Sequence, residues 1–590
     1  MAIPSQRITS DLLSFPAYTP AETLSDTTRH LCGAAYLDTG FSDVVIREVL
    51  EDERRAVPPS FGFDLDPVVR HCLRARRLML ARDAVVTGLV LLGLVLAPGP
   101  TLGWLGVGAI VLIRKSPWAR RLAPNARAGL YGVIAVLALV SACCLGAVWG
   151  PMLNGFSFSS ATESAFDQSI SEPTETDLYG ILLLSFFLPL ALGFVTFLLL
   201  LRFRRQTYEI LVRELAPERP VQQWAVSNGR IERRLNRIAA GQRGNITVQE
   251  SDPFLGAGNV MHGWSFAITL RTAKSSGGLP GPGPSGWGPA GSGEPVRLDA
   301  VELVTHVRDA VLRMRDSALP ERERVAGLYP VPHVVADGVR RQEDPLLEPR
   351  SSMPYSMASD EALEAIIRTP QGGLRYYERF VVPLGGKRID ADDGKMVLPA
   401  QSLGCEVAVF VHLAVEGGTL YAELMATLLP PVQRRYQLAD MLNEDRLTSR
   451  AVRDTLRGFA GDTAGAPSRL VGGLRRNRNI LRRMNEASQD SQEFRAYDYG
   501  ARLSVREFAA EPDVHKFLQA LDGWKYVKLL DRVVSEAIID FLTDHGVDTT
   551  EFRAGVAYVH NQFGGIDISG GQVNLGGANV SFTQLSHAHT

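Results

Sequence analysis

Four apolar runs between residues 84 and 201 restrict the fold of this chain more than any other feature. The runs 129–149 and 178–201 contain 21 and 24 residues without a charge. A helix of this length crosses the hydrocarbon core of a bilayer, which is roughly 30 Å thick. Because soluble cores rarely contain such long uncharged runs, the block predicts a helical membrane anchor.

The first apolar region, 84–113, is interrupted by Ala97, Pro98, Gly99 and Pro100. Since two prolines so close together break a helix, we expect a helix, a tight turn and a second helix. Each half is short, so the halves either extend into their flanks or form a re-entrant hairpin. The predicted block therefore consists of two hairpins and four helices, with spans at about 84–97, 101–113, 129–149 and 178–201.

The charges that flank these runs predict the orientation of the block. Basic residues cluster in 70–82, 114–127 and 202–205, whereas the loop 150–177 contains no lysine or arginine. The positive-inside rule then places both termini in the cytoplasm, with the block in the plasma (inner) membrane. The spans contain no ionisable side chain, which argues against an ion-coupled transporter.

Beyond the block, the sequence predicts an α+β fold for a large cytoplasmic region. Strands are expected at 245–250, 264–270 and 376–384, followed by a hairpin of 405–414 with 420–428. The predicted organisation is a cytoplasmic helical region at 1–82, the transmembrane block at 83–205, an α+β region at 206–445 with a flexible insertion at 275–295, a helical region at 446–562 and a short β-like glycine-rich tail at 563–590. Helices are expected at 296–316, 361–368, 449–460, 524–542 and 550–562.

A glycine-rich stretch at 254–263 has the GxG spacing of a phosphate-binding loop. Such a loop needs a following helix, whose N-terminus faces the anion. The residues that follow alternate between apolar and polar as in a strand, so the alternative is a glycine-rich hairpin or close packing of the backbone.

A basic segment at 469–483 has helical spacing and no acidic residue. Its apolar side chains Leu470, Leu474, Leu481 and Met484 are expected on one side. This segment could lie on the anionic inner leaflet, face solvent against Glu486, Asp490 and Glu493, or bind nucleic acid. The membrane-surface candidates are Arg469, Arg475, Arg476, Arg478, Arg482 and Arg483.

Paired glycines recur every six residues in the tail, at 564–565, 570–571 and 576–577. The residues between them alternate as in short strands. Three such strands bury too little apolar surface alone, so the tail is either an assembly element or disordered. The assembly candidates are Ile566, Ile568, Val573, Leu575, Val580 and Phe582.

No catalytic motif marks a reaction, and no cofactor or metal is expected. The net charge of −2 predicts no nucleic-acid partner, and the five cysteines are expected to be reduced. We therefore expect a membrane-anchored scaffold or docking protein whose partners are the bilayer, other proteins or further copies. The alternatives are a membrane-bound enzyme or a nucleotide or ligand sensor in the cytoplasmic region, and a transporter subunit.

Three segments resemble parts of multi-pass membrane proteins of actinobacteria: residues 32–77, SDPFLGAG with GWSFAITL at 251–270, and GVDTTEF at 546–552. The resemblance implies a membrane protein of a bacterium. It implies no activity, cofactor or functional residue.

Overall fold

The computed structural model describes residues 12–96, 98–115, 131–133, 135–136, 175–272, 294–320, 323–325, 327–391, 394–563, 566–569, 572–575 and 578–580, except for residues 223, 250 and 515. The chain divides into two compact units. The larger unit contains 1–70, 220–437 and 483–590, and the smaller unit contains 71–219 and 438–482. Residues 150–174 of the predicted loop 150–177 lie outside the described residues, as do most of the insertion 275–295 and of the run 129–149, whereas 175–177 begin the helix α7 (Glu175–Glu209).

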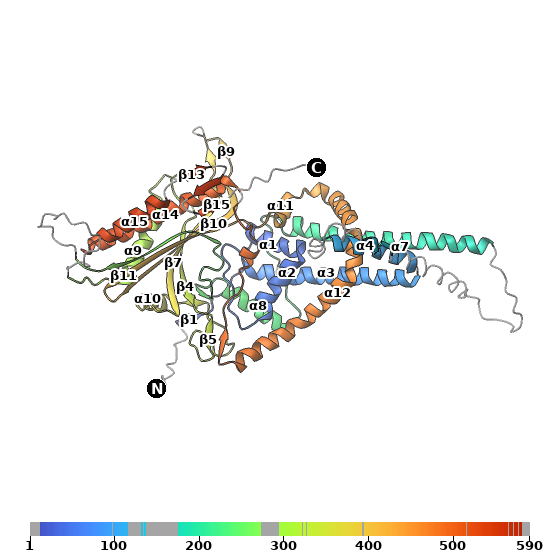
Figure 1. The fold of residues 1–590 in the computed structure, drawn as a ribbon, viewed down its shortest axis with the longest axis horizontal. Helices are drawn as coiled ribbons and strands as arrows, with labels where there is room; N and C mark the ends of the chain where they lie inside the picture. Colours follow the sequence, from blue (N-terminus) through green and yellow to red (C-terminus); the bar gives the residue numbers. More distant parts are fainter. Residues whose placement is uncertain are drawn as a thin grey trace. The chain divides into compact units, whose positions relative to one another are not determined.

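A six-stranded sheet organises the larger unit, in the order β2-β4-β7-β10-β11-β3 (Figure 1). The pair β2 and β4 is parallel and every other pair is antiparallel. The expected hairpin is confirmed, with its turn at 417–418. The strands are β2 Ile246–Val248, β3 Asn259–Thr269, β4 Tyr329–Ala336, β7 Leu374–Gly386, β10 Gln401–Glu416 and β11 Thr419–Leu429.

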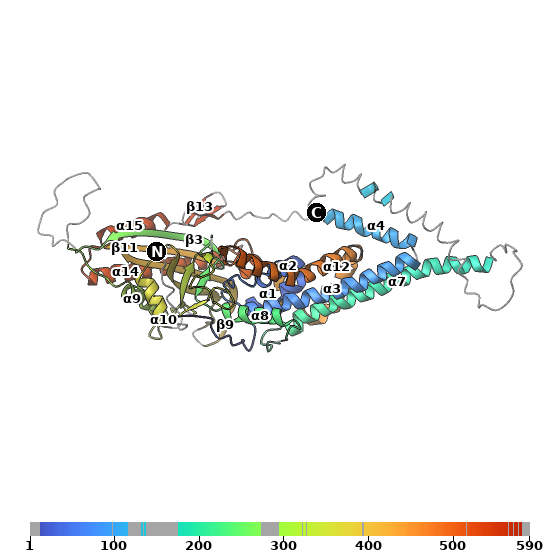
Figure 2. The same ribbon diagram turned by 90° about the horizontal axis from the view of Figure 1, so that it is seen from below.

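Alternating side chains give this sheet two different faces. Along β10, Val407, Val409 and Val411 enter the main hydrophobic core, whereas Ala408 and Phe410 enter a second, smaller cluster. Helices α9 (Ala300–Leu312) and α14 (Phe517–Asp544) pack on the first face, on one side of the strands in Figure 2. Burial on both faces explains the nearly continuous apolar run of β10.

Strand β4 was not predicted, because prolines disfavour a strand within a sheet. Pro330 and Pro332 nevertheless pair with β7, opposite Phe380 and Glu378. The backbone N–H of Val334, an even-numbered residue of β4, points toward β2 and donates to the carbonyl of Asn245. The prolines share this direction, and β2 is paired only with residues 334–336 of β4. An N–H group at position 330 or 332 would therefore point to the side of β4 where no strand is paired. The prolines thus remove no hydrogen bond from the sheet.

The two strands expected to flank the glycine-rich stretch do not form a hairpin. Strand β2 pairs with β4 and β3 pairs with β11, so they lie at opposite edges of the same sheet. The intervening residues therefore cross the sheet instead of making a tight turn. The strands before and after residue 300 do share one sheet, and the mixed α+β class is confirmed for the larger unit.

The predicted helices of the larger unit are present, with shifted ends. Asp299 caps α9, because its carboxylate accepts from the backbone N–H of Val301, and Ser359 caps α10 in the same way. The remaining elements are α1 Asp26–Leu37, α2 Thr39–Val45, the π-helix η1 Ile46–Glu51, α8 Gly229–Gly241, the 3-10 helices η3 Arg313–Arg315 and η4 Arg434–Gln437, α10 Asp360–Arg368, α13 Val505–Ala509, α15 Thr550–Phe563 and the two-stranded pairs β1 Leu13–Ser14 with β6 Met357–Ala358, β5 Val339–Arg341 with β12 Ala496–Asp498, and β8 Ile389–Asp390 with β9 Met396–Leu398.

The smaller unit is built from long helices, with α3 and α7 side by side (Figure 2). Val86 and Val90 of α3 pack with Leu200 of α7 and Ala466 of α12. The break at residues 97–100 is confirmed, since α3 ends at Leu96 and α4 begins at Pro98. The helical elements with residues in this unit are α3 Leu65–Leu96, α4 Pro98–Lys115, α7 Glu175–Glu209, the π-helix η2 Ile210–Glu214, α11 Leu438–Met441, the 3-10 helix η5 Glu444–Arg446 and α12 Leu447–Glu493.

Helix α12 is continuous where two helices were predicted. It contains Pro467, which lacks the N–H for one helical hydrogen bond. Around the proline, the Ser468 hydroxyl donates to the carbonyl of Gly465, and Arg469 donates to the carbonyl of Asp462. These two carbonyls flank that of Thr463, which lacks its helical donor because residue 467 is a proline, and the helix continues through the interruption.

The predicted block of four transmembrane helices is not supported. Among the described residues, only α3 is long and apolar enough to cross a membrane, and a single helix of this kind also occurs in soluble cores. The apolar run at 84–96 is the C-terminal part of α3, because the helix already begins at Leu65. The second run lies in α4 and the fourth in α7.

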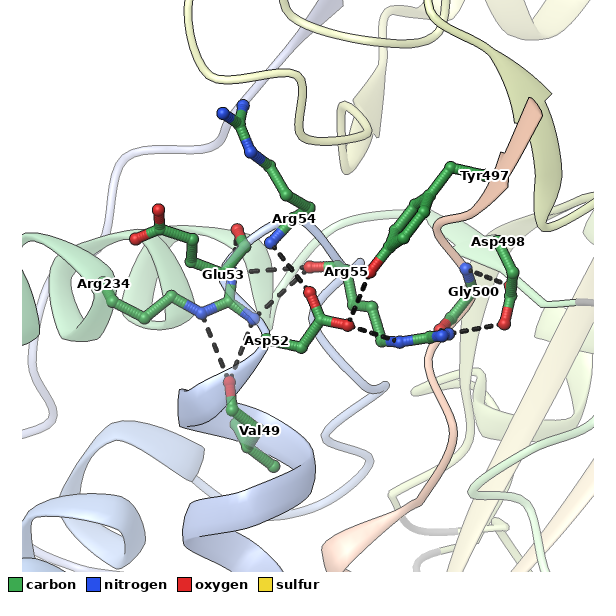
Figure 3. A network of polar contacts seen from close by, with 9 residues as sticks. All are labelled: Val49, Asp52, Glu53, Arg54, Arg55, Arg234, Tyr497, Asp498 and Gly500. Carbon is green, nitrogen blue, oxygen red and sulfur yellow. Dashed lines mark hydrogen bonds and ion pairs between the residues drawn. The ribbon is translucent and has the colours of Figure 1, made fainter. Parts of the chain in front are cut away.

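A network of buried polar groups holds the segment 49–55 against α8 and β12 (Figure 3). Arg234 of α8 is almost fully buried, and its guanidinium donates to the carbonyls of Val49, Glu53 and Arg55 over 2.9–3.3 Å. Arg55 in turn donates to Asp52 at 2.8 Å and to Asp498 at 2.6 Å. Burial lowers the pKa of Arg234 to about 10, so the side chain remains charged at neutral pH.

We predict that Arg234→Ala destabilises the full-length protein by about 3 kcal/mol, because it leaves buried carbonyls without a donor. Thermal unfolding in detergent measures the change. The matched control is Arg233→Ala on the exposed side of α8, which should change the stability by less than about 0.5 kcal/mol. Equal melting temperatures for the two variants would contradict the role of Arg234.

Candidate functional site

The glycine-rich loop between β2 and β3 already holds a carboxylate of this chain. Gly256 and Gly258 have φ of +95° and +87°, the left-handed region that favours glycine. The backbone N–H of Gly258 donates to Glu507 Oε1 at 2.8 Å, and that of Gly256 also bonds Glu507. The carboxylate of Glu507, from α13, thus accepts the backbone N–H groups that would bind the anion in a phosphate-binding loop. The loop is followed by strand β3 and not by the helix that such a loop needs.

Beneath this loop, the second face of the sheet is closed by aromatic and charged side chains. The ring of Phe254 lies 4.8 Å from that of Phe410, centroid to centroid. Arg379 stacks over Phe61 at 3.5 Å and donates to Glu406 at 2.8 Å, and Arg506 donates to the other oxygen of Glu406 at 3.1 Å. These side chains fill the space below the loop with an internal ion network.

His333 of β4 belongs to the same buried layer. Its Nε2 lies 3.4 Å from the carbonyl oxygen of Pro253, and its ring contacts that of Phe410. Burial, assisted by the nearby positive charge of Arg379, lowers the pKa of His333 to about 3. This histidine is therefore neutral in the folded protein under ordinary conditions.

A pocket of about 200 Å³ lies between β3, α14 and α15, beside two histidines that share one carboxylate. His262 Nε2 and His560 Nε2 lie 3.3 and 3.2 Å from Asp531 Oδ2, and Trp264 donates to Asp531 Oδ1 at 2.8 Å. Burial alone would raise the pKa of Asp531, but the hydrogen bonds from His262 and Trp264 lower it. Among the described residues, no group of three or more His, Cys, Asp or Glu side chains is placed to hold a metal ion.

The arrangement orients both imidazoles and leaves His560 partly exposed at the pocket. An imidazole held by a buried carboxylate is suited to accept or donate a proton. Lys528 and Arg532 line the same pocket, so its rim is basic. Sequence reasoning missed this group, because Trp264 and Asp531 are 267 residues apart along the chain. The only early signal was the alternation that places His262 on the same strand face as Trp264.

A larger cavity of about 600 Å³ lies at the end of the sheet, near the turn between β10 and β11. Its wall combines apolar side chains of α10 with Arg375, His412 and Tyr421. His412 Nδ1 is 2.7 Å from the carbonyl of Tyr376, which fixes its ring. This cavity offers mixed polar and apolar contacts without a catalytic arrangement.

Comparison with known proteins gives one match. Residues 263–579 match the model of the AbeC-like domain, which covers more than half of the chain. The chain belongs to the AbeC-like domain family. No curated protein and no solved structure matches it. The AbeC-like domain begins in β3 and ends in β15 of the tail, so it includes α12 and leaves out α3, α4 and α7.

Within the AbeC-like domain, the six arginines of the basic segment have different surroundings. Arg469 pairs with Asp83 at 3.2 Å and Arg483 pairs with Glu51 at 2.8 Å. Arg475, Arg476, Arg478 and Arg482 are exposed. Arg469 and Arg483 thus pair with acidic residues from α3 and η1, which the sequence did not indicate.

The four apolar side chains predicted to share one side of this segment differ in their exposure. Met484 is buried, whereas Leu474 and Leu481 are 54% and 38% exposed. The buried side of α12 instead includes Gly473, where an added Cβ would lie 2.5 Å from Leu80 Cδ2 of α3. Close contact of α3 with this glycine sets the rotation of α12, and the rotation leaves two of the four apolar side chains outside.

The end of the AbeC-like domain forms a three-stranded antiparallel sheet from β13 Ile566–Ser569, β14 Gln572–Leu575 and β15 Ala578–Val580. Ile566 pairs with Leu575, and Val573 pairs with Val580. The six-residue period therefore corresponds to strands of a meander. Phe582 and the side chains of the other assembly candidates, Ile568 included, lie outside the described residues.

We predict that His333 makes the protein less stable in acid. Its folded-state pKa of about 3 is below the unfolded value of about 6.5, so only the unfolded chain takes up a proton as the pH falls between them. Lowering the pH from about 7 to about 5 should cost the wild type about 2 kcal/mol more than His333→Phe. Denaturant titrations at both pH values measure this difference.

The control for this comparison is His545→Phe, at an exposed position after α14. Its pH dependence should follow that of the wild type. An identical acid response for His333→Phe and the wild type would contradict the assignment of His333 as a neutral buried histidine.

Proposed function

We propose that this AbeC-like domain protein is a scaffold or docking protein anchored in a bacterial inner membrane, with both termini in the cytoplasm. The observation that carries the proposal is the apolar surface of the smaller unit. In α3, α4 and α7 of this unit, the large apolar side chains that are at least 39% exposed are Val85, Leu91, Leu92, Val95 and Leu96 of α3, Val107 of α4, and Phe187, Leu190, Phe194, Val195 and Leu198 of α7.

The spacing of these side chains supports immersion in lipid. Phe187, Leu190, Phe194 and Leu198 are three or four residues apart, so they share one face of α7. Soluble monomers rarely expose apolar patches beyond a few hundred Å², because each fully exposed side chain of this size costs about 2 kcal/mol in water. A bilayer removes this cost.

Charged residues stand at the end of this apolar surface. Asp83 immediately precedes the apolar part of α3, and Arg204 follows that of α7. Asp83 pairs with Arg469, and Arg204 pairs with Asp462 at 2.9 Å, so α12 contributes to both ion pairs. We call Asp83, Arg204, Asp462 and Arg469 the charged belt. It has the position expected of groups at the membrane–water interface.

The docking role is supported by the tail. Strands β13 and β15 each pair only with β14 among the described strands. Their outer edges carry backbone groups that can pair with a strand of another chain. Such strand addition would join either a protein partner or further copies of this protein.

The double variant Leu91→Asp with Phe194→Asp should lose its attachment to membranes. Each aspartate in a spanning helix costs about 3 kcal/mol for insertion. Extraction of membranes at alkaline pH, followed by detection of the full-length protein, measures the attachment. Aspartates at the exposed positions Gln371 and Ser317 of the larger unit provide the control. Wild-type protein in the soluble fraction would contradict the anchor.

Deletion of residues 564–590 should reduce the size of the detergent-solubilised complex, because it removes all three strands of the tail. Size-exclusion chromatography with light scattering measures this size. Deletion of 581–590 alone leaves β13, β14 and β15 in place and should preserve it. An unchanged size after the longer deletion would rule out association through the tail.

A further inference from the structure

Strands β7 and β10 separate at one end of the six-stranded sheet. Their pairing ends at Val411, which lies opposite Glu378. Strand β10 continues to Glu416, because it remains paired with β11 on its other side. The first residues of β7 likewise remain paired with β4. The two strands therefore diverge beyond Val411, and each is held only from its outer side.

The cavity of about 600 Å³ lies where these strands diverge. Three successive residues of each strand line it, 374–376 of β7 and 412–414 of β10. We call it the strand-end cavity. Its volume is typical of ligand sites, and it occupies a place where a continuous sheet would have backbone hydrogen bonds.

The backbone groups of Tyr376 face β10. Val334 lies opposite Tyr376 in the pair of β4 and β7, and its own N–H points away from β7, toward β2. Directly opposite residues of an antiparallel pair either face each other or both face away. Tyr376 therefore faces away from β4, and its carbonyl oxygen lies 2.7 Å from Nδ1 of His412 in β10.

The same rule gives the direction of Leu413 in β10. Glu378 is two residues from Tyr376 and also faces β10, so Val411, opposite Glu378, faces β7. Leu413 is two residues beyond Val411 and faces β7 as well. In a continued ladder its N–H would donate to the carbonyl of Tyr376, but Nδ1 of His412 takes that position. The backbone N–H and C=O of Leu413 therefore face the strand-end cavity, beyond the end of the ladder.

The two faces of the sheet give the strand-end cavity two different walls. The side chain of Leu413 belongs to the main core, and Ile366 and Ile367 of α10 line the cavity on that face. His412 lies on the opposite face, where its ring is 6.0 Å from that of Tyr421. An extended chain beside Leu413 would therefore place alternate side chains against an aliphatic wall and a polar wall.

His412 offers one ring nitrogen to a ligand. The side chain is 6% exposed, and burial lowers its pKa, so the imidazole is neutral at ordinary pH. Because the carbonyl of Tyr376 can only accept, Nδ1 carries the proton and Nε2 is an acceptor. Within the part of the chain that the structure describes, Nε2 makes no hydrogen bond. The polar wall therefore favours a ligand group that donates, such as a hydroxyl.

We propose that the strand-end cavity binds an extended peptide segment of a partner protein, which adds to the free edge of β10 at Leu413. The peptide exchanges backbone hydrogen bonds with Leu413, and one of its aliphatic side chains packs against Ile366 and Ile367. The next residue is a serine or threonine, whose hydroxyl donates to Nε2 of His412. A small apolar ligand would leave the backbone groups of Leu413 without a partner. The inference deepens the docking role proposed above, and so rests on it, but it uses neither the tail nor the membrane anchor.

The probe is an array of hexapeptides offered to the full-length protein in detergent. In half of the peptides, valine, isoleucine or leucine alternates with serine or threonine; in the other half, alanine replaces the hydroxyl residues. Fluorescence anisotropy then measures the affinity of each peptide. We expect saturable binding that is about fivefold tighter for a hydroxyl peptide than for its alanine analogue, because one hydrogen bond is lost.

Methylated peptides test for the added strand. Alternate residues of an extended peptide turn their N–H groups toward β10. Methylation of the backbone nitrogens at the even positions or at the odd positions should therefore abolish binding in one case only.

Neighbouring glycines provide a matched pair of variants. Gly372 lines the strand-end cavity and Gly373 does not, and an added Cβ would meet no atom within 4 Å at either position. Gly372→Trp should therefore fold and block the peptide, whereas Gly373→Trp should bind it like the wild type. His412→Asn retains a donor for the carbonyl of Tyr376 but lacks Nε2. It should weaken the hydroxyl peptides about fivefold and leave the alanine analogues unchanged.

Three outcomes would overturn the proposal. Absence of saturable binding by every peptide of the array would reject the site. Equal binding by Gly372→Trp and Gly373→Trp would place the peptide elsewhere on the protein. Equal binding of the two methylated forms would mean that the cavity recognises side chains or a small ligand and adds no strand.

Deletion of residues 564–590 separates this inference from the docking role of the tail. The deleted protein should bind the peptides as the wild type does. If no peptide binds while the deletion still reduces the size of the complex, docking through the tail stands and the strand-end cavity is rejected. Peptide binding together with an unchanged size would support the cavity and reject the tail.

Discussion

The larger unit depends on the strict alternation of side chains along β7, β10 and β11. Tyr376, Phe380 and Val382 of β7 enter the same core as alternate residues of β10, and α9 and α14 cover that core. The odd-numbered Tyr377 and the even-numbered Phe410 meet on the other face. A shift of one residue in any pairing would exchange these two sets, so the register fixes both cores together.

The charged groups of the larger unit are consequences of this two-sided burial. The side chains of Arg379, Arg506 and Glu406 are buried below the loop, and the two guanidinium groups share Glu406 as their partner. Arg234 instead donates to the carbonyl of Val49 within the π-helix η1 and to those of Glu53 and Arg55, which follow that helix. In both places a guanidinium with several donors in one plane satisfies oxygens from different segments of the chain.

Sequence patterns predicted elements where the local signal agreed with the fold. The hairpin of β10 and β11 and the helices α9, α14 and α15 follow directly from periodicity. Three features escaped prediction because distant contacts decided them. The prolines of β4 face a side without a paired strand, Pro467 is bridged by neighbouring side chains, and β2 and β3 pair with strands far along the chain. The pocket at Asp531 depends on packing of α14 and α15 against β3, which no sequence spacing encodes.

The prolines of β4 also bear on how this protein avoids aggregation. A strand edge with regularly spaced N–H groups is a template on which another chain can add a strand. At Pro330 and Pro332 the template is interrupted at two successive positions of the same edge. Another sheet therefore cannot extend along this part of β4, whereas β13 and β15 contain no proline at their outer edges. The two prolines therefore protect only the β4 edge of the central sheet, because β3, its opposite edge strand, contains no proline either.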